Sequence, residues 1–436
     1  MGFNLQLSKV PQRAIFGGIL FTMTAPKISQ EQLDAFLPHE LLDQLALTCK
    51  VDAKNQVRLP GKLVFLCLLH NLLYHKDLTL RLMEETYTQK TGRHADHSSF
   101  AARLAVIKPA YFEAIFHHFY EKLAPTATEG EKQALKLRFV DATTVTLSAK
   151  LMTFGLLVGS RAPDKSHRHV KSVLELRGGL PQLLRLCKDQ SQNSDNVALG
   201  GTMADHTQPG DLWIFDKGCN SRERLWDLHT RKAFFLTPHH QQGILTHRII
   251  FALANDLLPT HPPVPGDTGF VVTQVTTGVF ANSVQSGNER FRAMPLVVVN
   301  GLRFDKRSAS WKPLTLLSNL VLQEDERIGS YTFDEFAQVY ARRWDIEVFF
   351  KFVKQHLNFS HLTSRCLNGI LVMFYMSLIA SLILLWYKQQ TKIDRGWRSV
   401  KSWLAFDLQK WLVAAFDEAF ATLVDRHSCN SLVFLE

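Results

Sequence analysis

The chain has 436 residues, of which 46% are hydrophobic and 21% charged, with a formal net charge of +10 at pH 7. This composition excludes an intrinsically disordered chain, and the length allows roughly two to four domains. The basic balance favours a polyanionic partner such as nucleic acid, with generic basicity as the alternative. Six cysteines without a CxxC motif or paired Cys/His spacing indicate reduced thiols in a cytosolic protein, not a zinc site or a disulfide framework.

Residues 1–27 are expected to form a poorly ordered leader. Within them, residues 14–25 are apolar and follow Lys9 and Arg13, a pattern that resembles a weak signal peptide. The apolar run is short, and the scattered cysteines give no support for secretion. We therefore favour a leader, or a true start at Met23, over a secretory signal.

Residues 28–130 are predicted to form a helical N-terminal domain that binds DNA. Helical runs separated by polar turns are expected at residues 31–37, 40–48, 62–73 and 110–123. Basic side chains are dispersed through this region, and residues 98–104 are a candidate for a capped helix presented to DNA. The region has no clean helix-turn-helix signature, so a helical scaffold without nucleic-acid contacts remains the alternative.

Residues 131–225 change to a strand pattern. Apolar and β-branched runs predict strands at residues 135–145, 170–177, 181–186 and 212–216. Gly178 and Gly179 separate the second and third of these strands, which predicts a hairpin. Further strands after a hairpin favour a mixed α/β sheet.

Two acids lie toward the ends of predicted strands, namely Asp141 in the first and Asp216 in the last. An Asp in this position is usually a turn or helix-cap residue. Two such acids at one sheet edge, joined by a Glu from a helix, would instead form an oxygen site for Mg²⁺. Other acids that could compete with Asp216 for a metal are Glu175, Asp205 and Asp211.

Residues 226–312 are predicted to form a β-rich insertion, preceded by a short helix at residues 221–229. The expected strands, of which the last returns to the main sheet, are residues 233–237, 269–275, 290–294, 296–299 and 314–318. Trp311 is a tryptophan of this β-rich part.

Residues 340–354 contain no Gly or Pro and are predicted to form one helix. At helical spacing, one narrow stripe of this helix carries Tyr340, Arg343, Glu347 and Lys354. Such a stripe can be a simple ion-pair ladder, because Arg343 and Glu347 are four residues apart. The alternative is functional, since cations beside a metal-binding carboxylate can hold DNA phosphates.

Residues 366–387 contain no Asp, Glu, Lys or Arg and are long enough to span a membrane. We favour a helix buried at the centre of a soluble protein, because a helix that is apolar all round can occupy that place. Residues 388–401 are basic and include Trp397. A helical tail is expected in residues 391–436.

The spacing of Tyr340, Arg343, Glu347 and Lys354 matches the Tyr-Arg-Glu-Lys signature of one branch of the DDE transposases. The chain resembles these enzymes of bacterial insertion sequences, in the insertion-sequence-four family that includes the Tn-five-like enzymes. Residues 139–143 and 213–218 resemble the two strand motifs that carry the family's aspartates. The resemblance covers about residues 30–390.

The resemblance implies an RNase H-like mixed sheet core formed by residues 131–225 and 313–390 and interrupted by the β-rich insertion. It implies that Asp141, Asp216 and Glu347 are catalytic and bind two Mg²⁺ (or Mn²⁺) ions, with Asp141 bridging both ions. It further implies that Tyr340, Arg343 and Lys354 contact DNA. In Tn-five-like enzymes an insertion aromatic stacks on a flipped base, and Trp311 is a candidate for this role or for the core.

By the same resemblance, the protein is expected to be a cut-and-paste DNA transposase. It would cleave the transposon ends through a hairpin and transfer the free 3′-hydroxyl to target DNA. The expected partners are double-stranded DNA, as terminal inverted repeats and target, and a second copy in a homodimeric synaptic complex. The expected location is the bacterial cytoplasm, associated with the nucleoid and not with a membrane. The alternatives are an inactive DNA-binding descendant of a transposase and a nuclease that cuts without joining.

Overall fold

The structure is a computed structural model of the chain. It describes residues 28–52, 58–124, 135–146, 156–159, 166–187, 194–199, 202–239, 243–264, 269–281, 289–323, 327–357, 364–393 and 395–432. The predicted leader, residues 1–27, lies outside the described residues, as does the end of the predicted N-terminal domain, residues 125–130.

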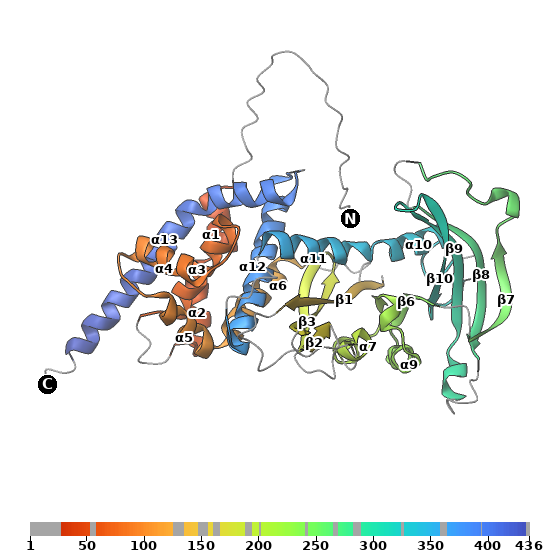
Figure 1. The fold of residues 1–436 in the computed structure, drawn as a ribbon, viewed down its shortest axis with the longest axis horizontal. Helices are drawn as coiled ribbons and strands as arrows, with labels where there is room; N and C mark the ends of the chain where they lie inside the picture. The colour runs from red at the N-terminus through yellow and green to blue at the C-terminus, as the bar shows by residue number, and fades with distance from the viewer. Residues whose placement is uncertain are drawn as a thin grey trace, which may run out of the picture. The chain divides into compact units, whose positions relative to one another are not determined.

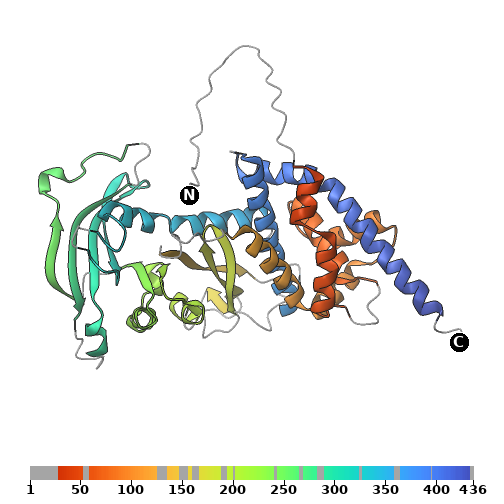
Figure 2. The same cartoon turned by 180° about the vertical axis from the view of Figure 1, so that it is seen from behind.

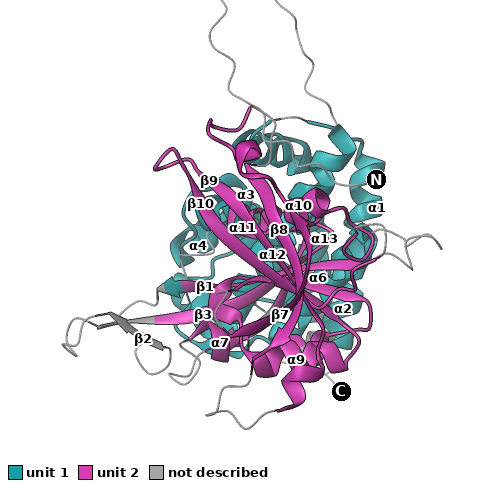
Figure 3. Ribbon diagram, turned by 90° about the vertical axis from the view of Figure 1, so that its right-hand side faces the viewer, with its two compact units in different colours: residues 1–125, 145–153, 350–436 teal, residues 126–144, 154–349 magenta. Residues whose placement is uncertain are grey.

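The chain divides into two compact units, coloured separately in Figure 3. We call the first the helical unit (Met1–Pro125, Val145–Thr153 and Phe350–Glu436) and the second the sheet unit (Thr126–Thr144 and Phe154–Phe349). The finer division into six segments stays a prediction.

The helical unit contains helices from both ends of the chain, labelled in Figure 1. They are α1 (Gln30–Phe36), α2 (His39–Thr48), α3 (Gly61–Tyr74), α4 (Leu80–Thr91), α5 (His97–Val106), α6 (Pro109–Leu123), α12 (Leu367–Thr391) and α13 (Trp397–Leu432). The four predicted N-terminal helices are confirmed within one or two residues as α1, α2, α3 and α6. The cap of α5 is Asp96, which accepts a hydrogen bond from Ser99 N at 2.8 Å, so the helix begins before the predicted 98–104 segment.

Helix α12 forms the apolar centre of the helical unit. Of the described helices it alone is long and apolar enough to cross a membrane, and 89% of its most apolar window is buried. It packs against α3, α5, α6 and α13, and Trp386 stacks on Phe36 with ring centroids 4.3 Å apart. The prediction of a buried helix is therefore confirmed.

The sheet unit is built on one ten-stranded mixed sheet, whose long outer strands curve (Figures 1 and 2). The strands are β1 (Lys136–Thr146), β2 (Leu156–Gly159), β3 (Ser166–Arg177), β4 (Leu180–Cys187), β5 (Asp211–Ile214), β6 (Phe234–Pro238), β7 (Ile244–Ala252), β8 (Phe270–Phe280), β9 (Leu296–Asp305) and β10 (Ser310–Ser318). Their order is β2-β3-β1-β5-β6-β10-β9-β8-β7, with β4 paired to β3. Strands β1, β5 and β6 are parallel, whereas β6, β10, β9, β8 and β7 alternate in direction.

The predicted β-rich insertion continues the sheet, because β6 pairs with β5 and β10 pairs with β6. The strand predicted at residues 290–294 is wrong, since residues 290–293 belong to a 3₁₀ helix, η6 (Glu289–Ala293). Strand β7 was not predicted. It lies at the edge of the sheet, is exposed along much of its length and has two register irregularities, so its sequence lacks a clean apolar alternation.

One face of the parallel strands is covered by short helices. These are α7 (Asp195–Ala198), α8 (Thr202–His206) and α9 (Arg222–Thr230). Their apolar side chains join a buried cluster with Val140, Trp213 and Phe235 from β1, β5 and β6. Arg342 lies over the ring of Phe139. Because successive side chains of a strand point to opposite faces, Phe139 and Val140 face opposite sides of the sheet. The residue that follows Val140 along β1 is Asp141.

Candidate active site

The strand register explains how two distant aspartates come to the same edge. Phe139 on β1 pairs with Ile214 on β5 at the last step of their parallel ladder. Asp141 lies two residues beyond Phe139, and Asp216 lies two residues beyond Ile214. Because parallel strands run in the same direction, both residues leave the paired region on the same side. Strand β1 continues to Thr146, so Asp141 lies within the strand and not near its end as predicted.

Asp141 is half-buried, and its Oδ1 accepts a hydrogen bond from Ala142 N at 2.8 Å. Burial raises the pKa of Asp141 to about 6. Arg343 acts in the opposite direction, whereas the charges of Glu347 and Asp195 raise the pKa further. Asp141 is therefore a carboxylate that is partly removed from water and close to two other acids.

Asp216 is exposed and directly follows the buried residue Phe215. It occupies the N-cap position of η4 (Lys217–Cys219), but its side chain makes no capping hydrogen bond. The usual explanation for such an Asp, helix capping, therefore does not account for its carboxylate.

The predicted single helix over residues 340–354 is wrong. Helix α10 (Phe333–Ala341) ends before Arg342 and Arg343, and α11 (Trp344–His356) begins after them. In the turn, Arg343 N bonds to Tyr340 O at 2.9 Å and Asp345 N bonds to Arg342 O at 2.9 Å. These bonds span three residues, so the helix tightens locally without any Gly or Pro.

The turn still brings Arg343 to Glu347 in the first turn of α11. Their Nη2 and Oε1 atoms are 2.5 Å apart, with side chains 12% and 33% exposed. The guanidinium lies 5.9 Å from the ring centroid of the buried Tyr340. Burial lowers the pKa of Arg343, but Tyr340, Glu347 and Asp216 raise it more, so the guanidinium is held charged.

The charge of Arg343 thus interacts with all three predicted acids, Asp141, Asp216 and Glu347. Among the residues that the structure describes, no three His, Cys, Asp or Glu side chains converge as a ready metal site. The donor set nevertheless suits a hard cation, because it consists of three carboxylates, one of them with a pKa raised by burial and by its acidic neighbours. Such a cation would offset the repulsion among them.

Lys354 lies on the part of α11 that belongs to the helical unit, and its side chain is half-buried. The other five predicted site residues belong to the sheet unit.

Two of the acids that could compete for a metal are committed elsewhere. Arg138 on β1 binds Glu175 through Nε and Nη2 at 2.7 and 2.5 Å, and binds Asp211 through Nη1 at 2.7 Å. The three side chains are at most 3% exposed. The guanidinium also lies 3.9 Å from the ring centroid of Trp213. Glu175 and Asp211 are therefore ion-pair partners of Arg138, whereas Asp205 on α8 is exposed.

Three residues beside the site were missed from the sequence: Asp195, Lys171 and Arg224. Lys171 Nζ and Asp195 Oδ1 are 2.7 Å apart. A signal for Lys171 existed, because a lysine within the apolar strand pattern of residues 170–177 needs a partner if it is buried. Nothing in the sequence identifies Asp195 as that partner.

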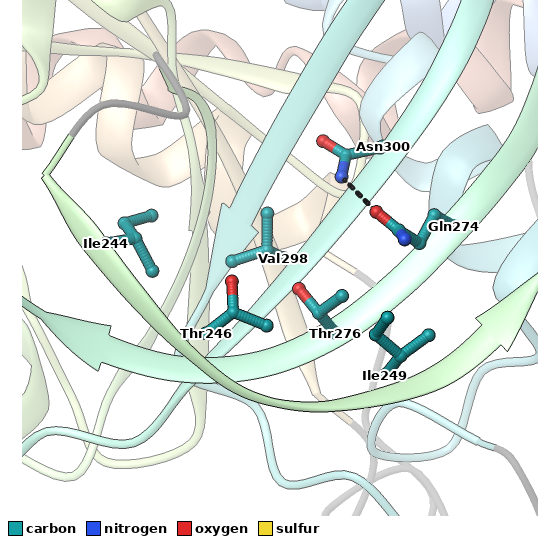
Figure 4. A pocket seen from close by; sticks show the side chains of 7 residues that line it. All are labelled: Ile244, Thr246, Ile249, Gln274, Thr276, Val298 and Asn300. Atoms are coloured by element: carbon teal, nitrogen blue, oxygen red, sulfur yellow. Dashed lines mark hydrogen bonds between the residues drawn. The ribbon is translucent and has the colours of Figure 1, made fainter.

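Two features of the β-rich part lie away from these acids in the sequence. Trp311 is half-buried against Phe304, and its Nε1 donates to His261 O at 2.9 Å, so its base-stacking role stays a prediction. A groove of about 330 Å³ lies on β7, β8 and β9 (Figure 4). Its polar side chains are Thr246, Gln274, Thr276 and Asn300, and it has no charged lining residue.

Comparison with known proteins identifies the family. Residues 133–383, more than half of the chain, match the transposase DDE domain. The matched range includes all three acids, the Tyr340–Arg343–Glu347 region and Lys354.

Two curated relatives match shorter stretches. One, from Synechocystis sp. (strain ATCC 27184 / PCC 6803 / Kazusa), is described as a transposase for insertion sequence element IS4SA. It is 36% identical over 69 residues, which are 16% of this chain and 20% of that protein. The other, described as a transposase for insertion sequence element IS5377 of Geobacillus stearothermophilus, is 33% identical over 86 residues, or 20% of this chain and 21% of that protein. The chain thus spans about a fifth of the length of each relative.

Among solved structures, a piggyBac transposase synaptic complex with hairpin DNA aligns with 92% of this chain and 87% of its own. The TM-score is 0.44 at 10% sequence identity. Since the family domain matches more than half of the sequence, the chain belongs to the transposase DDE domain family.

Proposed function

We propose that the protein is a DNA transposase that cleaves the ends of a mobile element and joins them to target DNA. Asp141, Asp216 and Glu347 would hold two Mg²⁺ or Mn²⁺ ions in an RNase H-like core. The substrates would be terminal inverted repeats and target duplex, bound by a homodimer in the bacterial cytoplasm at the nucleoid.

The observation that carries this proposal is the strand register of the two aspartates, together with the ion pair between Arg343 and Glu347. Asp141 and Asp216 each lie two residues beyond Phe139 and Ile214, the last paired residues of the neighbouring parallel strands β1 and β5. Glu347 enters from α11, and the charge of Arg343 interacts with each acid. All three acids come from distant parts of the sequence and belong to the sheet unit. The parallel strands β1, β5 and β6, with the β3–β4 hairpin beyond β1, support the RNase H-like core.

The roles of the chain's own groups follow from their chemistry. The divalent cations, when bound, would activate the attacking oxygen and neutralise charge on the phosphoryl group. Asp141, Asp216 and Glu347 supply the hard oxygen ligands for these cations. Arg343 is charged and can hold a DNA phosphate by paired hydrogen bonds. The Tyr340 ring lies beside the guanidinium, and Tyr340 and Lys354 would add contacts to DNA from α10 and α11.

The test is Mg²⁺-dependent cleavage of DNA that carries the element's terminal repeats. Asp141→Asn, Asp216→Asn and Glu347→Gln should each abolish cleavage while leaving DNA binding in place. Asp227→Asn is the matched control, because the side chain of Asp227 on α9 is 41% exposed and pairs with Arg231, the residue that follows α9. If all three variants cleave like the parent, the proposed function is wrong.

Strand joining is tested separately with pre-cleaved ends. Insertion of the 3′-hydroxyl end into a target plasmid is the expected result. Cleavage without joining would indicate a nuclease, and metal-independent binding without cleavage would indicate an inactive DNA-binding descendant.

A further inference from the structure

Asp195 is an acid beside the candidate active site with no role in the proposed function. It is the first residue of α7, where Ser194 caps the helix by accepting a hydrogen bond from Val197 N at 3.2 Å. Asp195 Oδ1 accepts a hydrogen bond from Lys171 Nζ at 2.7 Å. The Lys171 side chain is 7% exposed and that of Asp195 is 49% exposed, so a buried cation holds a carboxylate that is open to solvent.

Hydrogen bonds from one side chain connect α7, which carries Asp195, to η4, which follows Asp216. The guanidinium of Arg224 on α9 donates to the carbonyl of Cys219 in η4 and to the carbonyl of Asn196 in α7. A Cβ built on Gly218 would lie 3.8 Å from Oδ2 of Asp195. The second carboxylate oxygen of Asp195 therefore faces the segment that begins at Asp216.

The charge of Asp195 also reaches the strand that carries Asp141. Asp195 contributes to the raised pKa of Asp141, whose first cause is burial. Asp195 also contributes to the raised pKa of the Cys219 thiol, whose first cause is again burial. The charges of Asp141 and Asp216 raise the pKa of this thiol as well. Asp195 thus shares its surroundings with both proposed aspartate ligands.

We propose that Asp195 is a positioning residue of the divalent-cation site, and that Lys171 sets how strongly its charge acts there. This inference rests on the proposed function, because it takes Asp141, Asp216 and Glu347 as the cation's ligands. Negative charge next to the ligands attracts a divalent cation, and a neighbouring positive charge opposes it.

The inference predicts opposite changes in Mn²⁺ affinity for variants of Asp195 and of Lys171. Mn²⁺ is titrated by calorimetry into the full-length protein without DNA. Asp195→Asn should weaken Mn²⁺ binding several-fold, because it removes a negative charge next to the proposed ligands. Lys171→Met should strengthen Mn²⁺ binding, because it leaves the carboxylate of Asp195 unopposed, and Lys171→Arg should keep the parent affinity. Partial unfolding cannot explain this pattern, because it would weaken binding in both charge-changing variants.

The matched controls are Asp227→Asn and Arg231→Met, which make the same charge changes in an exposed pair at the end of α9 whose atoms are 3.2 Å apart. Both should bind Mn²⁺ like the parent. Parent-like affinity in Asp195→Asn, or weaker binding in Lys171→Met, overturns the inference. If Asp141→Asn loses Mn²⁺ binding while Asp195→Asn keeps it, only the inference fails. If Asp141→Asn also binds like the parent, the proposed function fails with it.

Discussion

At the scale of single residues, Arg343 organises the charges of the candidate site. It pairs with Glu347 at 2.5 Å and interacts with Asp141 and Asp216. A cation among acids has two consequences. It offsets their mutual repulsion in the free protein, and it presents a planar donor group to DNA phosphates.

Arg343→Ala should therefore weaken DNA binding more than it weakens folding. The Arg343–Glu347 pair is partly exposed, so its loss should cost on the order of 1 kcal/mol of stability. Fluorescence anisotropy measures DNA affinity, and urea unfolding measures stability. Arg343→Lys should recover only part of the affinity, because an ammonium cannot bind a phosphate bidentately. Unfolded Arg343→Ala protein would instead favour a purely structural ion-pair ladder.

Asp141 predicts a pH-dependent stability in protein kept free of divalent cations. Its pKa is about 6 when folded, against 3.8 as the reference value. Between these pH values the folded state binds the proton more tightly, so the contribution of Asp141 to stability falls as pH rises from about 4 to 6. The Asp141→Asn variant does not lose stability in this way, because Asn does not ionise. Its melting temperature should exceed that of the parent above pH 6, and the difference should vanish below pH 4. A constant difference across this range would contradict the burial of Asp141.

At the scale of elements, the sequence predicted the strands and helices that have strong patterns. Strands β3, β4 and β5, with the Asp216 turn, followed from apolar runs bounded by Gly and Asp. The break between α10 and α11 was not predictable from residue type, because Arg342 and Arg343 are compatible with a helix. In the folded chain Arg342 lies over the ring of Phe139 on β1, a tertiary contact that the local sequence does not encode. Asp195 was missed for a similar reason, since its partner Lys171 lies on another element.

The Arg138 cluster joins three strands of the core, because its members lie on β1, β3 and β5. Arg138→Met would leave Glu175 and Asp211 buried without their cation, which should cost about 3–5 kcal/mol. Urea unfolding measures this loss. Adding Glu175→Gln and Asp211→Asn to the same protein should recover part of it, because no unpaired buried charge then remains. Arg231→Ala, in an exposed pair, should change stability by less than about 1 kcal/mol. An Arg138→Met protein as stable as the parent would be inconsistent with the cluster.

At the scale of the whole molecule, the net charge of +10 predicts DNA affinity that depends on salt. Each phosphate neutralised on duplex DNA contributes a slope of about −0.9 to log K against log salt concentration. Anisotropy titrations over a range of potassium chloride concentrations should therefore give a steep slope. Lys354→Ala and Arg343→Ala should each reduce its magnitude by about 1. A flat response of the parent protein to salt would exclude phosphate contacts as the basis of binding.

The central claim is that three acids from distant segments, Asp141, Asp216 and Glu347, jointly hold a pair of divalent cations. Electron paramagnetic resonance of Mn²⁺ titrated into the protein bound to a terminal-repeat duplex tests this claim directly. We predict two coupled Mn²⁺ ions per chain in the parent, and loss of the coupled signal in Asp141→Asn, Asp216→Asn and Glu347→Gln. A coupled signal that persists in any of the three variants would contradict the account.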